Sequence, residues 1–504
     1  MGPTEAAAPE LAAVSEPEFA GPAQRETLDP QDWEGFRTLA HRTLDRMIDL
    51  QRDIRDEPVW RQVPDDVERR FQEAAPVDGA PIEEVLRDVA QLVVPYPTGN
   101  LHPRFWGWVG GTGSPTGMLG DLIAAGTNSV AGNFNDAAAR VEEQVTRWMA
   151  DAIGMPTGTT GLITSGGSVA NLVGLAAARD AVAGFDVPGR GVRAAPGQLA
   201  LYASTEVHSS VTKAAQLLGI GRDGLRLIPT DAQYRIDTNL LSRTMREDRA
   251  DGFVPIGIVG NAGTVNTGAI DDLDRLADIA RDESVWLHVD GAFGAVAALS
   301  DNLRPLLRGL ERADSVALDF HKWMYVPYEA GAVLVRDADA LKRPFASDAA
   351  YLAPPPRGVG AQPDPANGRG PQLSRGFKAL KVWMLIKEQG LAKYGRLVEQ
   401  NVRDVRHLAA LIDSHPDLDR VAPAPLNVVC FRYAPRGAAP DAPLDEWNQE
   451  ILMRLQERGI AVPSSTVLRG HFVLRVANVN HRTRAEDFDL LVRETLRIGR
   501  ELSG

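Results

Sequence analysis

Between residues 111 and 345 the sequence alternates short apolar runs with longer segments of helical composition. A chain that alternates strands and helices in this way folds into a mostly parallel sheet wrapped by helices. The pattern therefore predicts a doubly wound α/β domain. The strand-like runs are 201–203, 225–228, 256–259, 285–289, 316–318 and 332–335.

Two of these runs lead directly into residues that can carry chemistry. Asp290 follows 285–289 in Leu-His-Val-Asp, and Lys322 follows 316–318 in Asp-Phe-His-Lys-Trp. Open α/β sheets bind their ligands at the carboxyl ends of the strands. We therefore expect Asp290 and Lys322 to emerge at neighbouring strand ends, in one ligand site.

A lysine and an aspartate in this arrangement suit pyridoxal 5′-phosphate (PLP). The lysine amine forms a Schiff base with the aldehyde of this cofactor, and a carboxylate keeps the pyridine nitrogen protonated so that the ring accepts electrons. We predict these roles for Lys322 and Asp290. Either residue alone would be better explained as a surface lysine or an acidic helix cap, and only the combination favours the cofactor.

A phosphate site is expected at Gly166-Gly167-Ser168, which precedes a helical segment. Glycines let the backbone approach an anion, and a helix N-terminus attracts negative charge. We predict that Gly167 and Ser168 bind the phosphate and that Ser168 can also cap the helix. A glycine-rich turn alone is a weak signal, but Lys322 already requires a charged ligand.

His208 and Thr264 also follow apolar runs. The imidazole of His208 can lie flat on a pyridine ring, although a histidine at this place could simply help to cap the following helix with Ser209 and Ser210. Thr264 could bond a ring substituent or the phosphate, or it could be only a turn residue.

The remaining segments frame this domain. Residues 1–30 are rich in Ala, Pro and Glu and predict a disordered tail. Residues 31–110 predict an N-terminal helical segment with an apolar stripe that needs a surface, for example another subunit. The large domain is expected over 111–395, with a proline- and glycine-rich mobile loop at 352–372. Residues 396–504 predict a small C-terminal α+β domain.

The charge of the chain excludes several function classes. A formal net charge of −13 argues against a sequence-independent grip on nucleic acid or on an anionic membrane. No apolar run approaches the ~18 residues that would predict a membrane span, and the acidic N-terminus resembles neither a signal nor a transit peptide. We expect a cytoplasmic protein.

Cysteine and histidine usage argues against metals and disulfides. Cys430 is the only cysteine and lies in an apolar strand pattern, so a buried structural role is favoured over a nucleophile. The nine histidines show no spacing typical of metal ligands. We predict no metal site.

Taken in order, these motifs resemble the group II PLP-dependent amino acid decarboxylases, which include the aromatic-L-amino-acid and glutamate decarboxylases. The resemblance runs from about His102 into the C-terminal domain and implies a type I PLP fold with a mostly parallel seven-stranded sheet. It also implies a homodimer with active sites at the subunit interface. The motifs are His102-Pro103-Arg104-Phe105, Gly166-Gly167-Ser168, Ala170-Asn171-Leu172, His208-Ser209-Ser210-Val211, Gly268-Ala269-Ile270-Asp271, His288-Val289-Asp290-Gly291-Ala292, His321-Lys322-Trp323, and Arg375 with Phe377, Leu380, Lys381 and Trp383.

The resemblance implies an activity, which is decarboxylation of an L-amino acid to its amine and carbon dioxide. It gives Lys322, Asp290, His208, Gly167 and Ser168 the roles already derived for them. Two roles are implied by the resemblance alone. Ala292 would be a small residue packed near the ring, and Tyr351 would be the mobile-loop acid that reprotonates the substrate α-carbon.

The chain departs from its relatives at several positions. Val265 replaces a second threonine, and Asp319 replaces an asparagine that binds phosphate in animal relatives, so we do not expect Asp319 to be a phosphate ligand. Trp106 and Trp108 fall where relatives line the substrate pocket with aromatic residues. They favour an aromatic substrate only modestly, because tryptophans are as often part of a core.

Other functions remain open at this stage. A PLP-dependent aldehyde synthase, aminotransferase or carbon-carbon lyase could use the same fold, and only Tyr351 and the order of the motifs select decarboxylation. A catalytically silent homologue with a structural or regulatory role is a third possibility. The intact set of Lys322, Asp290 and His208 argues against it.

Overall fold

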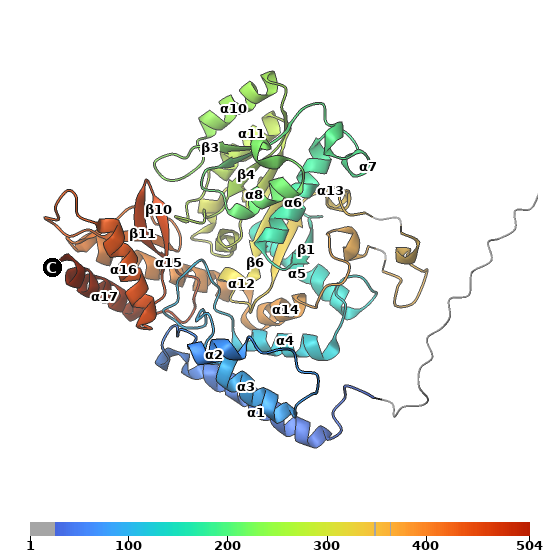
Figure 1. Cartoon of the computed structure of the whole chain (residues 1–504). Coiled ribbons are helices and arrows are strands. Elements are labelled where there is room, and N and C mark those ends of the chain that lie inside the picture. The colour runs from blue at the N-terminus through green and yellow to red at the C-terminus, as the bar shows by residue number, and fades with distance from the viewer. Residues whose placement is uncertain (1–25, 347–348, 363) are drawn as a thin grey trace, which may run out of the picture. The chain divides into compact units, whose positions relative to one another are not determined.

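The protein is described by a computed structural model over residues 26–346, 349–362 and 364–504 (Figure 1). The chain divides into two compact units, one that ends at Asp49 and one that comprises Leu50–Gly504. The first unit contains most of α1 (Trp33–Asp53), an amphipathic helix with no buried residue. Of the predicted disordered tail, residues 1–25 lie outside the described residues.

The centre of the second unit is a seven-stranded sheet with the order β1-β7-β6-β5-β4-β2-β3. Neighbouring strands run parallel except for β7, which is antiparallel to both β1 and β6. This confirms the predicted mostly parallel seven-stranded α/β sheet. The strands are β1 (Thr160–Thr164), β2 (Leu199–Ser204), β3 (Leu225–Ile228), β4 (Val254–Asn261), β5 (Trp286–Asp290), β6 (Ser315–Asp319) and β7 (Gly331–Val335).

Helices cover both faces of this sheet. Helix α6 (Gly167–Val182) packs across β4 to β7 on one face, with α8 (Ser209–Leu217) beside it. Helices α5 (Ala137–Ile153), α10 (Thr238–Ala250) and α11 (Leu273–Asp282) lie against the main hydrophobic core on the other face. Side chains alternate along each strand. In β5, Leu287 and Val289 therefore enter the main core, and Trp286 packs in the cluster under α6.

The remaining helices complete the chain (Figure 1). They include α12, a single turn that begins where β6 ends. The α-helices not yet bounded are α2 (Asp65–Arg70), α3 (Ile82–Asp88), α4 (Pro115–Thr127), α7 (Val187–Arg190), α9 (Gly221–Gly224), α12 (Phe320–Trp323), α13 (Ala338–Lys342), α14 (Ala379–Gln389), α15 (Leu391–Ser414), α16 (Leu444–Glu457) and α17 (Ala485–Ser503).

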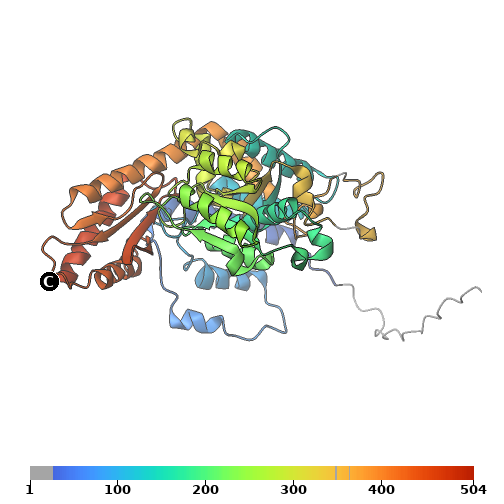
Figure 2. The ribbon, with the colours of Figure 1, turned by 90° about the horizontal axis from the view of Figure 1, so that it is seen from above.

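The C-terminal part forms the predicted small α+β layer. An antiparallel sheet with the order β10-β11-β9-β8 packs against α15, α16 and α17, the orange to red segments in Figure 2. Cys430 lies in β9, is buried, and has its pKa raised by burial to about 12, which confirms a structural cysteine. The strands are β8 (Leu418–Arg420), β9 (Val428–Tyr433), β10 (Ser464–Leu468) and β11 (His471–Ala477).

The proline- and glycine-rich stretch 352–372 is largely irregular where it is described, with one short 3₁₀ turn at Ala366–Gly368. This turn is tied down, because the backbone N–H of Asn367 donates to Asn133 Oδ1 over 3.1 Å. Val359 accepts from the backbone N–H of Asn135 over 2.8 Å.

Candidate active site

Lys322 lies one turn beyond β6 and forms a buried ion pair with the last residue of that strand. Its Nζ is 2.9 Å from Asp319 Oδ2, with 20% of the lysine side chain and 2% of the aspartate side chain exposed. Burial opposes a charged amine, but Asp319 and then Asp290 attract it, and the pKa of Lys322 is raised above its ordinary value. A Cβ at Gly111 would overlap the backbone oxygen of His321, so only glycine fits against this turn.

Asp290 ends the neighbouring strand β5 and is 5% exposed. Its two carboxylate oxygens accept from different neutral donors. Oδ1 accepts from the backbone N–H of Ala292 over 3.1 Å, and Oδ2 accepts from Asn171 Nδ2 over 2.9 Å. The carboxylate therefore has a fixed orientation without a cationic partner among these donors.

His208 is the N-cap of α8. Its Nδ1 accepts from the backbone N–H of Ser210 over 3.2 Å and lies 2.8 Å from Ser210 Oγ. Burial lowers the pKa of His208, Asp290 opposes this shift, and Lys322 reinforces it. The helix-capping contact that the sequence left open is thus present. The charges of Asp290 and Lys322 both act on this ring, and Asn171 bonds both Ser210 and Asp290.

The glycine turn before α6 adjoins Asp319, the ion-pair partner of Lys322. The helix begins at Gly167 with Gly166 as its N-cap and no side-chain cap. The expectation that Ser168 caps the helix was therefore wrong, because the helix begins one residue before it. Ser168 is exposed in the first turn. A Cβ at Gly167 would lie 2.9 Å from Asp319 Oδ2 and 3.3 Å from the Ala292 side chain, so the glycine leaves a cradle between them.

This arrangement fits PLP. It offers an amine for the aldehyde, a fixed carboxylate for the ring nitrogen, and the N-terminus of a sixteen-residue helix for the phosphate. Asp319 faces the same cradle and is bound to Lys322, and its exclusion as a phosphate ligand stays a prediction. Its other oxygen, Oδ1, is buried without a hydrogen-bond partner in the described structure.

The side chain of Thr264 forms hydrogen bonds within its own turn. The side chain is fully buried, its hydroxyl lies 3.0 Å from Thr267 Oγ1, and it accepts from the backbone N–H of Ala269 over 3.1 Å. These contacts close the loop that follows β4. They correspond to the turn-residue alternative for this threonine.

The three aromatic residues of the prediction differ widely in their burial. Trp106 is 1% exposed, stacks on Phe488 with ring centroids 4.7 Å apart, and belongs to the core of the C-terminal layer. Trp108 is 64% exposed and has a positive φ of 52°. Tyr351 is 78% exposed in the 3₁₀ turn Ala350–Leu352.

Sequence reasoning gave no role to Asn171, His288 and Ser315, which the structure places directly behind the site. His288 Nε2 is 2.9 Å from Asn171 Oδ1, and His288 Nδ1 is 2.7 Å from Ser315 Oγ. Strand alternation was the available signal, because residues two apart in β5 share a face. Asn171 lies four positions after Gly167, on the same side of α6.

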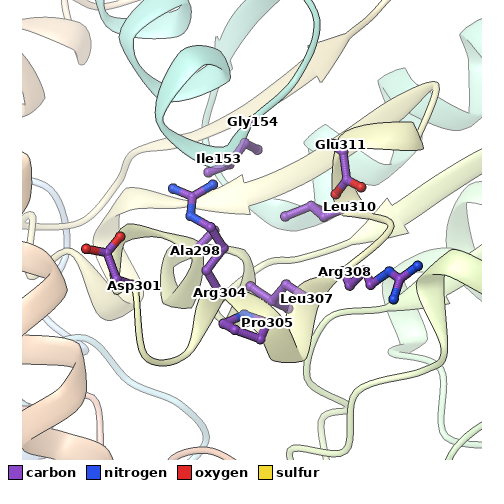
Figure 3. A pocket seen from close by; sticks show the side chains of 10 residues that line it. All are labelled: Ile153, Gly154, Ala298, Asp301, Arg304, Pro305, Leu307, Arg308, Leu310 and Glu311. Carbon is purple, nitrogen blue, oxygen red and sulfur yellow. The ribbon is translucent and has the colours of Figure 1, made fainter.

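A separate cavity of about 430 Å³ lies outside this cluster (Figure 3). Its wall contains Arg304, which points towards Gly154 and donates to the backbone oxygen of Ala152 over 2.7 Å. None of the ten residues that line it was predicted as a site residue. Across the described ranges, no group of three or more His, Cys, Asp or Glu residues could hold a metal ion, and no helix is long and apolar enough to cross a membrane.

Comparison with known proteins identifies relatives over nearly the whole chain. The family model described as "Pyridoxal-dependent decarboxylase conserved domain" matches residues 64–434. The aromatic-L-amino-acid decarboxylase of Bacillus atrophaeus is 33% identical over 473 residues, which cover 93% of this chain and 96% of that protein. The phenylacetaldehyde synthase of Petunia hybrida is 28% identical over 92% of this chain and 93% of its own length.

A solved structure gives the same fold. The tryptophan decarboxylase (TDC) of Oryza sativa, crystallised with PLP and tryptamine, superposes with a TM-score of 0.87 at 28% sequence identity. The match covers 95% of this chain and 100% of that chain.

Proposed function

Because the chain belongs to the family of pyridoxal-dependent decarboxylases and is a PLP-dependent carboxy-lyase acting on an L-amino acid, we propose that its substrate is aromatic and that Lys322, Asp290 and His208 carry the reaction. The observation that supports these roles is the convergence of a buried amine, a neutral-bonded carboxylate and an imidazole at the ends of adjacent elements.

When bound, PLP supplies the electron sink that stabilises the charge left on the substrate α-carbon as carbon dioxide departs. Lys322 binds the cofactor aldehyde, and Asp290 holds a proton on the ring nitrogen. His208 would stack on the ring, and Ala292 would leave room beside it. Gly167 and Ser168 would hold the phosphate, and Thr264 shapes a neighbouring loop; the cradle at the start of α6 supports the phosphate assignment.

We assign Tyr351 as the acid that returns a proton to the α-carbon. A phenol is suited to this step because it gives up its proton only to a strongly basic centre. Tyr351 is 78% exposed, so its side chain is accessible to a substrate or to another subunit. In the dimer proposed next, such a site would lie at the subunit interface.

A homodimer is supported by apolar stripes on helices of each unit. In the second unit, Leu119, Leu122 and Ile123 of α4 are exposed at helical spacing. In the first unit, Trp33 and Phe36 of α1 are exposed in the same way. Stripes of this kind mark protein interfaces. A cytoplasmic location is also proposed, since a single buried cysteine requires no oxidising compartment.

The aromatic substrate class is supported by the relatives that act on aromatic amino acids. Trp108 supports it as well, because its exposed indole is available to pack a substrate ring. Trp106 is left out of the proposed substrate wall, since its indole N–H donates to Thr483 over 3.1 Å inside a hydrophobic core.

A second candidate function is aldehyde synthesis, which the similarity to the phenylacetaldehyde synthase favours. The residue that separates the two outcomes is Tyr351. With a positioned acid the α-carbon is protonated and an amine leaves, whereas without one oxygen can divert the reaction to an aldehyde.

The test is mass spectrometry of the products after the purified protein, supplied with PLP, meets a mixture of L-amino acids in air. One amine that appears as one aromatic amino acid disappears is the expected result. A non-aromatic amine would overturn the substrate class. An aldehyde would move the protein to oxidative chemistry, and no product from any amino acid would favour a silent homologue.

A further inference from the structure

Behind the proposed cofactor site lies a chain of buried hydrogen bonds that reaches both Asp290 and His208. We infer that Asn171, His288 and Ser315 are positioning residues, which fix the orientation of the Asp290 carboxylate and the tautomer of His208 through one directed chain. The inference rests on the proposed roles of Asp290 and His208, and it deepens them.

Strand alternation brings the side chains of this hydrogen-bond chain to one face of the sheet. His288 and Asp290 are two residues apart in β5, and Ser315 is paired with His288 in the parallel neighbour β6. All three side chains therefore face α6, where Asn171 meets them. A Cβ at Gly174, one turn after Asn171, would lie 2.7 Å from His288 Cε1, so α6 is shaped to admit the imidazole.

The direction of the chain is set at Asn171. Its Nδ2 lies 2.9 Å from Asp290 Oδ2 and 2.9 Å from Ser210 Oγ. A carboxylate can only accept, so the group that faces Asp290 must be the NH₂ and not the carbonyl oxygen. Both protons of the amide are then used, and Asn171 Oδ1 must accept a hydrogen bond from His288.

His288 is consequently the Nε2–H tautomer. Burial lowers its pKa to about 4, so at neutral pH the ring carries one proton, and Asn171 fixes it on Nε2. The bare Nδ1 must accept from the hydroxyl of Ser315 over 2.7 Å. Ser315 Oγ in turn accepts from the indole N–H of Trp286 over 2.8 Å, and an indole can only donate.

The other branch ends at His208. Since Ser210 Oγ accepts from Asn171, its own proton is free to go to His208 Nδ1, 2.8 Å away. The backbone N–H of Ser210 donates to the same nitrogen. Neutral His208 therefore carries its proton on Nε2, the nitrogen that faces away from the helix cap.

Every member between the two ends has its donors and acceptors matched. His288 and Ser315 are fully buried, and Asn171 is 1% exposed. A buried polar chain that is completely satisfied holds one arrangement, because any reversed member would leave two donors or two acceptors facing each other. Asp290 and His208 thus receive their orientation from residues that never touch the substrate.

The direct test is the tautomer of each histidine at pH 7.5, read by nitrogen–proton correlation NMR on protein labelled with nitrogen-15 histidine, with and without PLP. Signals are assigned by their loss in His288→Gln and His208→Gln. We expect both rings as the Nε2–H tautomer. The Nδ1–H form at either ring would overturn the inference, and this measurement on the unaltered protein requires no variant to fold.

Asn171→Leu tests the positioning role, with Asn448→Leu as the matched control. Asn448 is also fully buried and bonds Tyr433, but it lies in the C-terminal layer. We expect Asn171→Leu to give mixed tautomers and to weaken PLP binding, measured by visible absorbance, roughly tenfold to a hundredfold, as for outer partners of metal ligands. The control should change neither.

If Asn171→Leu does not fold, Ser315→Ala is the second variant. It removes the hydroxyl that donates to His288 Nδ1, so His288 should again show a mixture of tautomers. Unchanged tautomers and unchanged PLP affinity in a folded variant would refute the positioning role. The outcomes separate this inference from the proposed function. If the protein makes amine while His288 is the Nδ1–H tautomer, only the proposed chain of hydrogen bonds is refuted. If both tautomers are as expected but the protein retains no PLP, the proposed function is refuted and the hydrogen-bond assignment stands.

Discussion

Replacing Asp319 by asparagine should make Lys322 much more reactive towards PLP. At 2.9 Å the attraction between the two charges is about 6 kcal/mol at an effective dielectric constant of ~20. Loss of hydration by the buried pair offsets most of this attraction and leaves roughly 1–3 kcal/mol, which is about one to two pKa units. Since Asp319 raises the pKa of Lys322, its removal should lower that pKa and increase the neutral amine.

The assay is stopped-flow absorbance of PLP binding to the cofactor-free protein at pH 8. We expect Asp319→Asn to bind about ten to a hundred times faster, because only the neutral amine attacks the aldehyde. Pyridoxal, which lacks the phosphate, is the matched probe. A gain seen with both compounds reports the amine, and an additional gain with PLP reports relief of repulsion between Asp319 and the phosphate. Equal rates for protein and variant with pyridoxal would refute the reasoning.

Three further outcomes are expected. Lys322→Ala should lose the visible absorbance of bound PLP and all amine production, and turnover retained by a folded variant would contradict its role. Tyr351→Phe should lower the yield of amine and raise that of aldehyde and hydrogen peroxide in air, as measured by mass spectrometry and a peroxide assay; an unchanged amine yield would remove the tyrosine from the mechanism. Burial lowers the pKa values of His102 and His288 to about 4, below the unfolded value of about 6.5, so the unfolded chain takes up their protons first. Each of these two histidines should lower the free energy of unfolding by about 2 kcal/mol between pH 7 and pH 5. The loss should be visible as a lower urea midpoint at pH 5. An identical midpoint at both pH values would contradict the burial of neutral rings.

The sequence predicted the sheet well because its strands are apolar and separated by helices. Six strand-like runs correspond to β2 to β7, whereas β1 was missed because Thr160–Thr164 contains only two large apolar residues. Lys322 and Asp290 were found through their positions after such runs. The start of α6 was misplaced by two residues, with Ser168 expected as the N-cap where the structure has Gly166, since a glycine N-cap leaves no side-chain signature.

Tryptophan positions could not be decided from the sequence. Trp106 and Trp108 are two residues apart in an irregular segment, where no strand or helix periodicity assigns a face. One is in a core and the other is exposed, and the difference depends on contacts with residues more than 350 positions away, such as Thr483 and Ser464. Tyr351 presents the same problem, because it is 78% exposed in a short 3₁₀ turn that no sequence periodicity marks.

The two carboxylates of the site are distinguished by their partners rather than by their depth. Asp290 is bound only by neutral donors, Asn171 and the backbone of Ala292, so its charge is left for a cation that arrives with the cofactor. Asp319 is bound by the amine that the cofactor aldehyde must reach. Cofactor binding would therefore give Asp290 a cationic partner and would remove the ammonium partner of Asp319. On this reasoning Asp290→Asn should weaken PLP binding while Asp319→Asn should strengthen it, and equilibrium titrations of both variants that moved in the same direction would contradict the division of roles.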